Sequence, residues 1–356
     1  MSTYQIAVIP GDGIGPEIVA AATQVLQQLA QVTSLTFELT TYEAGAATYL
    51  KHGDALPAET MMACRQAHAI FKGPTGLPDV RLPDGTEAGV LGGRFRRSLD
   101  LYVNLRPIKL YPNVPTALAN RQAGEIDWVM VRENTEGLYA SRGCGVVAST
   151  GQAVTDTLMI TRLGTERIVR YAFEEARRRN GKKRVCCVDK SNVLRSFVFF
   201  RQIFKEIAAA EYPDIATDFM YVDAAAQAIV LEPDRFDVMV TENMFGDILS
   251  DLGGATIGGV GVCAGANIGD NAAYFEPIHG SAPNLAGKGT ANPLSAILSL
   301  GLMLRYLNEL AAAQRLEQAI ETAFQQKTIM LNPDGSAQSG TQAVTEAVLK
   351  QLVINN

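Results

Sequence analysis

Two aspartates are spaced so that they could bind a divalent cation. Asp247 and Asp251 lie four residues apart in the segment N-M-F-G-D-I-L-S-D. On a helix, residues four apart share one face. Two carboxylates there repel each other unless a cation lies between them, and Mg²⁺ and Mn²⁺ prefer such oxygen ligands. An arbitrary D-x-x-x-D is more often one helix cap and one solvated aspartate, so the pair predicts a metal site only together with other residues.

Three arginines supply positive charge for an anionic ligand. Arg96, Arg106 and Arg132 lie near the ends of expected strands or loops, and Arg132 directly follows the apolar run 128–131. A guanidinium binds a carboxylate through two parallel hydrogen bonds. A single arginine is most often a surface residue, but three in such positions predict a pocket for a dicarboxylate.

Lys190 is a candidate acid or base. It closely follows the apolar run 185–188, at the kind of strand end where α/β proteins place their ligand-facing loops. Burial or neighbouring cations would lower the pKa of its ammonium group and suit it to proton transfer. In isolation, a lysine in this position is more often a surface residue.

Two glycine-rich segments could bind a nucleotide. The first covers residues 11–17, but Gly15 comes only two residues after Gly13, whereas the Rossmann fingerprint needs three. A structural turn is an equally good interpretation. The second covers residues 276–289 and is too rich in glycine and proline for a helix or strand. Its backbone groups could wrap a nucleotide, although His279 could equally be structural.

The elements that must position these residues indicate an α/β protein. Short apolar runs typical of buried parallel strands alternate with helical patterns. The expected strands are 5–9, 67–71, 128–131, 185–188 and 236–241. The expected helices are 16–29, 165–179, 293–307, 316–326 and 341–352. Arg132 and Lys190 therefore follow strands of a sheet whose ends are expected to carry the ligand-binding loops.

The composition fits a folded enzyme of two domains. The chain has 356 residues, which is more than one hydrophobic core usually serves. Of these residues 47% are hydrophobic and 19% are charged, a composition unlike that of a disordered chain. A net charge of −6 gives no field that would attract nucleic acid or an anionic membrane. Five cysteines without zinc or disulfide spacing predict a reducing cytoplasm. Neither a secretion signal nor a membrane-spanning stretch is expected.

Six motifs, in order along the chain, resemble the isocitrate/isopropylmalate dehydrogenase family of decarboxylating β-hydroxyacid dehydrogenases, and most closely its 3-isopropylmalate dehydrogenase-like members. They are G-D-G-I-G-P-E at 11–17, L-Y-V-N-L-R-P at 101–107, V-R-E-N-T-E-G at 131–137, V-D-K-S-N-V-L at 188–194, F-G-D-I-L-S-D at 245–251 and H-G-S-A-P-N-L-A-G-K-G at 279–289. The resemblance spans nearly the whole chain, and chance agreement of six ordered motifs is negligible.

The resemblance implies an α/β, isopropylmalate dehydrogenase-like two-domain fold with a mixed, largely parallel sheet that is not a Rossmann fold. Residues 1–100 and 252–356 would form a cofactor-binding domain that contains both termini. Residues 101–251 would form an inserted domain for substrate binding and dimerisation, with an intersubunit arm near residues 139–155. The active sites would be shared within a homodimer, because Lys190 and Asp223 would come from the second chain.

The resemblance also implies residue roles. Arg96, Arg106 and Arg132 would bind the carboxylates of a malate-type substrate, and Tyr139 and Lys190 would be the proton-transfer pair. The implied ligands of Mg²⁺ or Mn²⁺ are Asp223, Asp247 and Asp251. The implied cofactor-binding residues are Asn192, His279, Gly280, Ser281, Ala282, Asn284 and Asn292. A small hydroxy dicarboxylate or tricarboxylate would be oxidised by NAD and decarboxylated.

Two places depart from the family pattern. Members that use NAD commonly have an acidic residue where this chain has Asn284. NAD is favoured, but NADP stays open because an asparagine would not repel a 2′-phosphate. Gly92 and Gly93 stand where isopropylmalate enzymes present leucines and isocitrate enzymes present serine and asparagine. A 3-isopropylmalate-like substrate is favoured, and isocitrate, homoisocitrate, tartrate and D-malate stay open.

Two functions of other kinds compete with this interpretation. A non-catalytic regulatory subunit should have lost its ionisable groups, whereas Tyr139, Lys190 and all three aspartates are present. A Mg²⁺-dependent lyase without redox chemistry would leave the loop 279–289 without a role. Both are therefore less favoured than a dehydrogenase.

Overall fold

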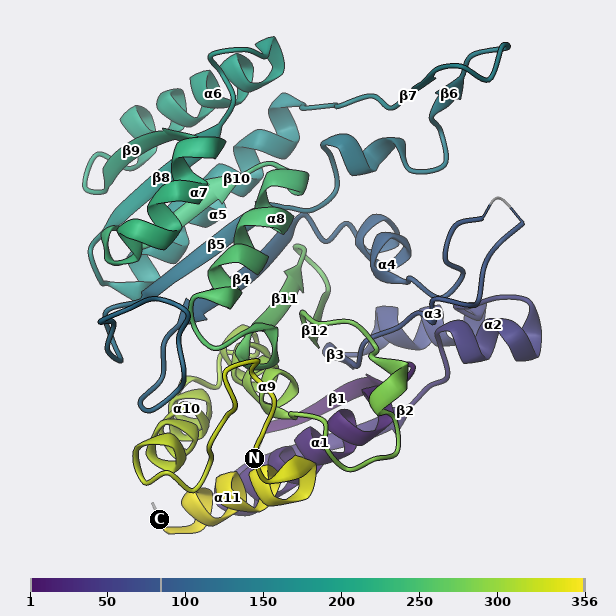
Figure 1. Cartoon of the computed structure of the whole chain (residues 1–356), viewed down its shortest axis with the longest axis vertical. Helices are drawn as coiled ribbons and strands as arrows, with labels where there is room; N and C mark the ends of the chain where they lie inside the picture. Colours follow the sequence, from purple (N-terminus) through teal and green to yellow (C-terminus); the bar gives the residue numbers. More distant parts are fainter. Residues whose placement is uncertain (1, 84, 355–356) are drawn as a thin grey trace.

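A ten-stranded sheet runs through the molecule. The structure is a computed structural model that describes residues 2–83 and 85–354, and the strand order is β2-β1-β3-β12-β11-β4-β5-β10-β8-β9 (Figure 1). The strands are β1 Ser2–Ile9, β2 Leu35–Thr41, β3 Ala69–Lys72, β4 Val103–Lys109, β5 Asp127–Glu133, β8 Arg184–Asp189, β9 Ala216–Tyr221, β10 Val238–Thr241, β11 Ala264–Ile268 and β12 Ala273–Pro277.

Helices cover this sheet. They are α1 Gly15–Gln31, α2 Ala46–His52, α3 Ala58–Gln66, α4 Gly92–Ser98, α5 Arg162–Arg179, α6 Arg195–Glu211, α7 Val222–Leu231, α8 Asn243–Ala255, α9 Leu294–Tyr306, α10 Leu310–Gln325 and α11 Gly340–Ile354. The α10 helix begins six residues before the expected 316–326, because the run Leu310–Ala313 adds good helix formers without a clear apolar period.

Two parallel halves of the sheet meet at antiparallel strands. The strands β2, β1, β3 and β12 are parallel to one another, and so are β5, β10, β8 and β9. Between them, β11 and β4 pair antiparallel with each other and with their outer neighbours. This confirms the expected α/β fold with a mixed, largely parallel sheet.

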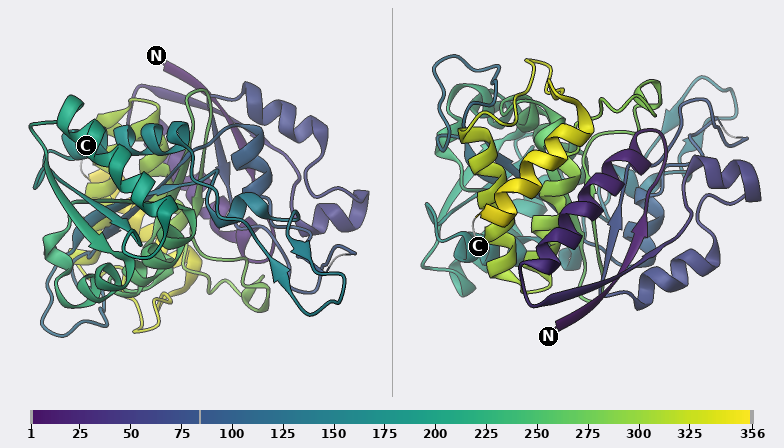
Figure 2. Two further views of the ribbon diagram at one scale, coloured as in Figure 1. Left: turned by 90° about the horizontal axis from the view of Figure 1, so that it is seen from above. Right: turned by 90° about the horizontal axis from the view of Figure 1, so that it is seen from below.

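The first and last parts of the chain build the same half. The strands β1, β2, β3, β11 and β12 belong to it, and α1 packs beside α11, as the view from below shows (Figure 2). Residues 103–241 supply the strands of the other half. This distribution agrees with an inserted segment, while the exact boundaries 1–100, 101–251 and 252–356 stay a prediction.

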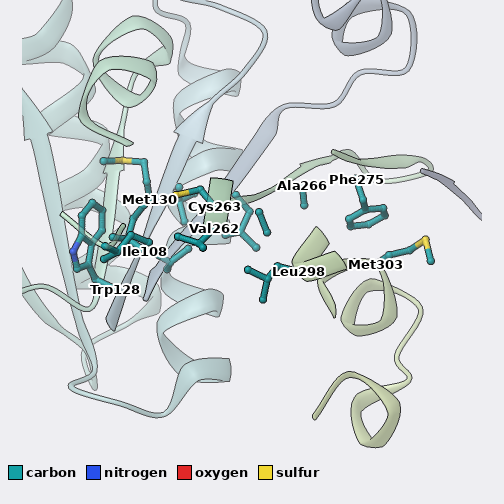
Figure 3. Packing of buried hydrophobic residues seen from close by; sticks show 14 of the residues in the cluster. Ile108, Trp128, Met130, Val262, Cys263, Ala266, Phe275, Leu298 and Met303 are labelled. Carbon is teal, nitrogen blue, oxygen red and sulfur yellow. The ribbon is translucent and has the colours of Figure 1, made fainter. Parts of the chain in front are cut away.

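The buried core continues from one half to the other. Trp128 and Ile108 pack in one half, Phe275 and Met303 in the other, and Val262 with Cys263 lies between them (Figure 3). In β5 every residue after Asp127 is buried, because helices α5 and α8 both pack on this strand. The continuous core holds the two halves together where β4 and β11 pair.

A small hairpin projects from the body of the molecule. It consists of β6 Val146–Val147 and β7 Val154–Thr155, which pair antiparallel (Figure 1). Val146, Val147 and Val154 each leave more than 60% of their surface exposed. The hairpin lies within the arm expected near residues 139–155, and its contact with a second chain stays a prediction. No helix in the described part of the chain is long and apolar enough to cross a bilayer.

Candidate active site

Strands β4 and β5 place two arginines beside helix α8. In the antiparallel register, Asn104 lies opposite Arg132 and Arg106 lies opposite Met130. Helix α8 packs on both strands, and a Cβ added to its Gly246 would lie 2.6 Å from Cβ and Cγ of Arg132. The glycine therefore leaves room for the buried Arg132 side chain against the helix.

Ion pairs join these arginines to the two aspartates of α8. Arg132 is hydrogen-bonded to Asp247, and Arg106 lies 3.3 Å from Asp247 Oδ1 and 3.0 Å from Asp251 Oδ1. The two carboxylates therefore share one helix face, as their spacing predicts. The hydroxyl of Tyr139 donates to Oδ2 of Asp247 at 3.1 Å.

Burial and charge shift the pKa values of this cluster. Burial raises the pKa of Tyr139, and the carboxylate of Asp247 raises it further. Burial would also raise the pKa of Asp247, but the Arg132 and Arg106 guanidiniums outweigh this and hold it below its usual range. Burial, together with the charges of Arg106 and Arg96, lowers the pKa of Arg132. A ligand with two carboxylates would relieve the repulsion among these cations.

Asn267 of β11 holds the third arginine. Its Oδ1 accepts hydrogen bonds from Arg96 Nε at 3.1 Å, from Asn104 Nδ2 at 2.8 Å and from Asn134 Nδ2 at 2.9 Å. The three donors come from α4, from β4 and from the residue that follows β5. Asn267 is fully buried, so this hub fixes Arg96 relative to both halves of the sheet.

A cavity of about 660 Å³ opens beside the cluster. Its wall includes four of the residues that the sequence predicts for the site, Arg96, Arg132, Tyr139 and Asp247. Arg106 and Asp251 do not line the cavity, but Arg106 contacts both Asp251 and the lining residue Asp247. The remaining polar side chains of the wall belong to Arg97, Asn134, Thr135, Ser141, Arg142, Asp156 and Asn243.

Lys190 and Asp223 form a separate ion pair. Nζ of Lys190, just after β8, lies 2.6 Å from Oδ1 of Asp223, in the first turn of α7. The hydrogen bond from Lys190 lowers the pKa of Asp223. Neither residue lines the cavity. Within the described ranges of one chain, no three His, Cys, Asp or Glu side chains gather to hold a metal ion, so Asp223 is not grouped with Asp247 and Asp251.

The expected cofactor loop packs on the turn that follows β1. The carbonyl of buried Ser281 accepts from the backbone N–H of Ile14 at 2.8 Å. A Cβ added to Gly13, whose φ is +59°, would lie 2.0 Å from that carbonyl oxygen, so both conformation and space require glycine there. Asp12 anchors the same turn, because its buried carboxylate accepts from the backbone N–H groups of Ala46, Ala47 and Gly76. In the structure, residues 11–14 form a tight turn and residues 15–17 begin helix α1.

The other expected cofactor residues are distributed unevenly. His279, Gly280, Ala282 and Asn284 share the loop with Ser281, and burial lowers the pKa of His279. Asn284 is exposed. Asn292 lies just before α9, where its Nδ2 donates to the carbonyl of Gly335 at 3.0 Å. Asn192 is exposed in the loop after β8, on the other half of the sheet.

Two buried asparagines were not among the predicted site residues. Asn243 accepts hydrogen bonds from Arg132 Nε at 3.1 Å and from its other guanidinium nitrogen, Nη2, at 2.7 Å. Its place at the start of N-M-F-G-D, directly after a strand, was a signal for it. Asn267 stands in none of the six motifs, and local sequence carries no sign of its role.

Known proteins match this chain over nearly its whole length. The model of the family described as isocitrate/isopropylmalate dehydrogenase matches residues 5–348. The 3-isopropylmalate dehydrogenase of Thermobifida fusca is 44% identical over 347 residues, which cover 96% of this chain and 95% of that protein. The corresponding protein of Corynebacterium glutamicum strain R is 42% identical over 352 residues, with 98% and 99% covered.

A solved structure gives the same result. The crystal structure of isocitrate dehydrogenase from Methylococcus capsulatus superposes with a TM-score of 0.87 at 39% identity, and the match covers 98% of this chain and 99% of that one. These similar proteins thus carry the names of two branches of one family. The expected resemblance is confirmed, and the chain belongs to the isocitrate/isopropylmalate dehydrogenase family.

Proposed function

We propose that the chain catalyses the metal-dependent oxidative decarboxylation of a (2R)-2-hydroxy dicarboxylic acid, with hydride transfer to NAD, and that the acid is a 3-substituted malate of the 3-isopropylmalate kind. Family membership makes the chain a decarboxylating dehydrogenase that acts on a CH–OH group. The observation that carries the finer proposal is the convergence of Arg96, Arg132, Tyr139 and Asp247 on one cavity.

The arginines would bind the substrate's two carboxylates. Arg96 and Arg132 line the cavity, and Arg106 lies beside Asp247. Each guanidinium can bind a carboxylate through two hydrogen bonds. The lowered pKa of Arg132, which burial and the other two arginines cause, supports this role, because an anion removes the repulsion among the cations.

Tyr139 and Lys190 would transfer protons. Lys190 would accept the proton of the 2-hydroxyl group, and NAD, when bound, supplies the acceptor for the hydride on C2. Oxidation at C2 gives a β-keto acid, which loses CO₂. Tyr139 would then protonate the carbon that CO₂ leaves. Its raised pKa supports this role, because the phenol stays protonated and able to donate at neutral pH.

Asp247, Asp251 and Asp223 would hold Mg²⁺ or Mn²⁺. Carboxylate oxygens suit these cations, and Arg106 contacts both aspartates of α8, so their oxygens face the same side. A bound cation stabilises negative charge on the substrate's 2-hydroxyl oxygen. Asp223 lies outside this group within one chain. We therefore propose a homodimer in which each site receives Lys190 and Asp223 from the second copy.

The loop 279–284 would bind NAD with its backbone and small side chains. Its exposed Asn284 offers a hydrogen-bonding amide, and neither position 284 nor position 285 carries a cation for a 2′-phosphate. NAD is therefore the proposed cofactor, with NADP as the alternative. A cytoplasmic location remains a prediction.

A substrate panel tests the proposal. Initial rates of NADH formation would be measured with Mn²⁺ and 3-isopropylmalate, isocitrate, homoisocitrate, D-malate or tartrate, each repeated with NADP and with EDTA. The proposal expects EDTA-sensitive NADH formation from a 3-substituted malate. Cleavage without NADH would favour a lyase instead. A folded protein that turns over none of these acids would favour the regulatory subunit.

A further inference from the structure

Asp12 is a buried carboxylate that the proposed reaction does not use. It stands in the turn after β1 and is 3% exposed. Its Oδ2 accepts the backbone N–H groups of Ala46 and Gly76, each at 2.7 Å, and its Oδ1 accepts that of Ala47 at 3.0 Å. Within the described ranges, no lysine or arginine pairs with it. Three backbone donors from two separate segments therefore stabilise this buried charge.

A ring of hydrogen bonds connects Asp12 to the loop 279–284. Gly76, whose N–H donates to Asp12, accepts through its carbonyl from the hydroxyl of Ser281 at 2.5 Å. The carbonyl of Ser281 accepts in turn from the N–H of Ile14 at 2.8 Å. Ile14 follows Asp12 by two residues, so the backbone closes the ring. The ring joins the turn after β1, the loop after β3 and the loop 279–284 into one unit.

The backbone around this ring is packed too closely for side chains at two further positions. A Cβ added to Gly11, whose φ is +78°, would lie 2.1 Å from the carbonyl oxygen of Pro74. A Cβ added to Gly45, directly before α2 and with a φ of +124°, would lie 2.4 Å from Oδ2 of Asp12. Such close packing transmits a displacement instead of absorbing it. The position of Ser281 should therefore depend on the carboxylate of Asp12.

The loop 279–284 needs support from outside itself. In this segment, all of which the structure describes, Ser281 is the only buried residue. The next residue, Ala282, has a φ of +37°, in the left-handed region that residues other than glycine rarely adopt. A backbone conformation of this kind persists where the surrounding structure holds it. The hydrogen bonds of Ser281 to the two neighbouring segments supply that support.

We propose that Asp12 is a positioning residue for the cofactor, which holds the loop 279–284 through Gly76 and Ser281 in the conformation that binds NAD. This inference rests on the proposed function, since it concerns the loop proposed to bind NAD. A loop that is already ordered loses less conformational freedom when its ligand binds. Loss of the carboxylate should therefore weaken cofactor binding and leave the steps on the bound acid largely unchanged.

The test measures the binding of NADH to the full-length protein by the change in NADH fluorescence, without hydroxy acid or metal. Asp12→Asn keeps the size of the side chain but places an N–H donor against backbone N–H groups. The Kd for NADH should rise about 10- to 100-fold, the effect of one charged hydrogen bond. The KM for NAD should rise with it, while kcat and the KM for the hydroxy acid change by less than about threefold.

Two further variants separate positioning from folding. Ser281→Ala removes the hydroxyl that bonds to Gly76 and should also raise the Kd for NADH. Because both changes break the same ring, the double variant with Asp12→Asn should raise the Kd by less than the product of the two single effects. Asp237→Asn alters a buried aspartate that pairs with Arg179 beside β10, in the other half of the sheet, and should leave the Kd unchanged.

The outcomes distinguish this inference from the proposed function. An unchanged Kd for NADH in folded Asp12→Asn, an equal rise in Asp237→Asn, or single effects that multiply in the double variant would overturn the inference while the proposed function stands. Circular dichroism monitors folding, and if Asp12→Asn does not fold, an unchanged Kd in Ser281→Ala decides against the inference. A folded wild type that binds neither NADH nor NADPH would overturn the proposed function as well.

Discussion

Tyr139→Phe removes a single oxygen atom and keeps the aromatic ring. Its ring lies 5.7 Å from the Arg132 guanidinium, and Tyr139→Phe keeps that contact while removing the hydroxyl that bonds to Asp247. We predict a fall in kcat of about 10²–10⁴-fold, because a general acid is lost, with little change in KM. Steady-state kinetics measure both. Tyr306→Phe is the matched control, and an equal loss there would remove the special role of Tyr139.

A buried ion pair gives a prediction about stability. Lys72 Nζ, at the end of β3, lies 2.6 Å from Glu276 Oε2 in β12, and their side chains are 2% and 16% exposed. Lys72→Met leaves the Glu276 carboxylate without its closest cation, bonded to the Asn267 amide at 3.2 Å, and should lower the free energy of unfolding by about 3–5 kcal/mol. Lys51→Met breaks an exposed pair with Glu43 and should change the free energy of unfolding far less, because solvent screens an exposed pair. Urea unfolding compares the two.

The same pair predicts a pH dependence. Burial would raise the pKa of Glu276, but the charge of Lys72 outweighs this and holds it below the unfolded value of 4.5. The stabilisation is therefore present above about pH 4.5 and is lost as the pH falls through the folded pKa. The difference in unfolding free energy between wild type and Lys72→Met should shrink over that range. A difference that stays constant down to pH 3 would contradict this origin.

At the scale of residues, the side chains that line the cavity were easier to predict from the sequence than the side chains that hold them in place. Arg96, Arg132, Tyr139 and Asp247 were predicted from charge, spacing and motif, and all line the cavity. The hub at Asn267 was not predicted, because its three hydrogen bonds depend on the antiparallel pairing of β11 with β4. Local sequence does not reveal which distant strand lies alongside.

Helix α8 depends on a glycine at the point where Arg132 passes. A Cβ at position 246 would lie 2.6 Å from the Arg132 side chain, so Gly246→Ala should displace this arginine and raise the KM of the hydroxy acid about tenfold. Gly301→Ala in α9 would meet nothing closer than 3.7 Å, and should instead stabilise the protein by about 0.4–1 kcal/mol. Kinetics and thermal unfolding of both variants test this contrast. An unchanged KM in Gly246→Ala would show that Arg132 does not depend on the glycine.

The strands that contain a continuous apolar run were predicted well from the sequence. The runs 128–131 and 185–188 lie in β5 and β8, because strands covered on both faces need apolar side chains throughout. In contrast, β11 has the sequence A-G-A-N-I, which combines a glycine and an asparagine with few β-branched residues. Such a strand is determined by its neighbours on both sides and gives little local signal.

At the scale of the whole molecule, the separation of Lys190 from the cavity predicts that two chains share each site. Lys190→Ala and Asp247→Asn should each be inactive as homodimers. Co-expressed chains that mix at random should recover about a quarter of the wild-type activity, because half the dimers are mixed and each has one intact site. Tandem affinity purification followed by rate measurement tests this. No recovery in a verified mixed dimer would mean that each chain builds its site alone.

The two-part organisation was predicted from chain length and from the resemblance, and the strand distribution follows it. How the halves join was not predicted, since the shared core at Trp128, Val262 and Phe275 (Figure 3) depends on the pairing of β4 with β11. The relation between two copies of the chain lies beyond what one chain's residues determine.

The most direct test of the central claim is the stoichiometry of NADH and CO₂. Both products would be measured during turnover of the best acid of the panel, with Mn²⁺ and then with EDTA. Oxidative decarboxylation predicts one CO₂ for each NADH, and loss of both with EDTA. NADH formed without CO₂, or CO₂ released without NADH, would contradict the proposed reaction.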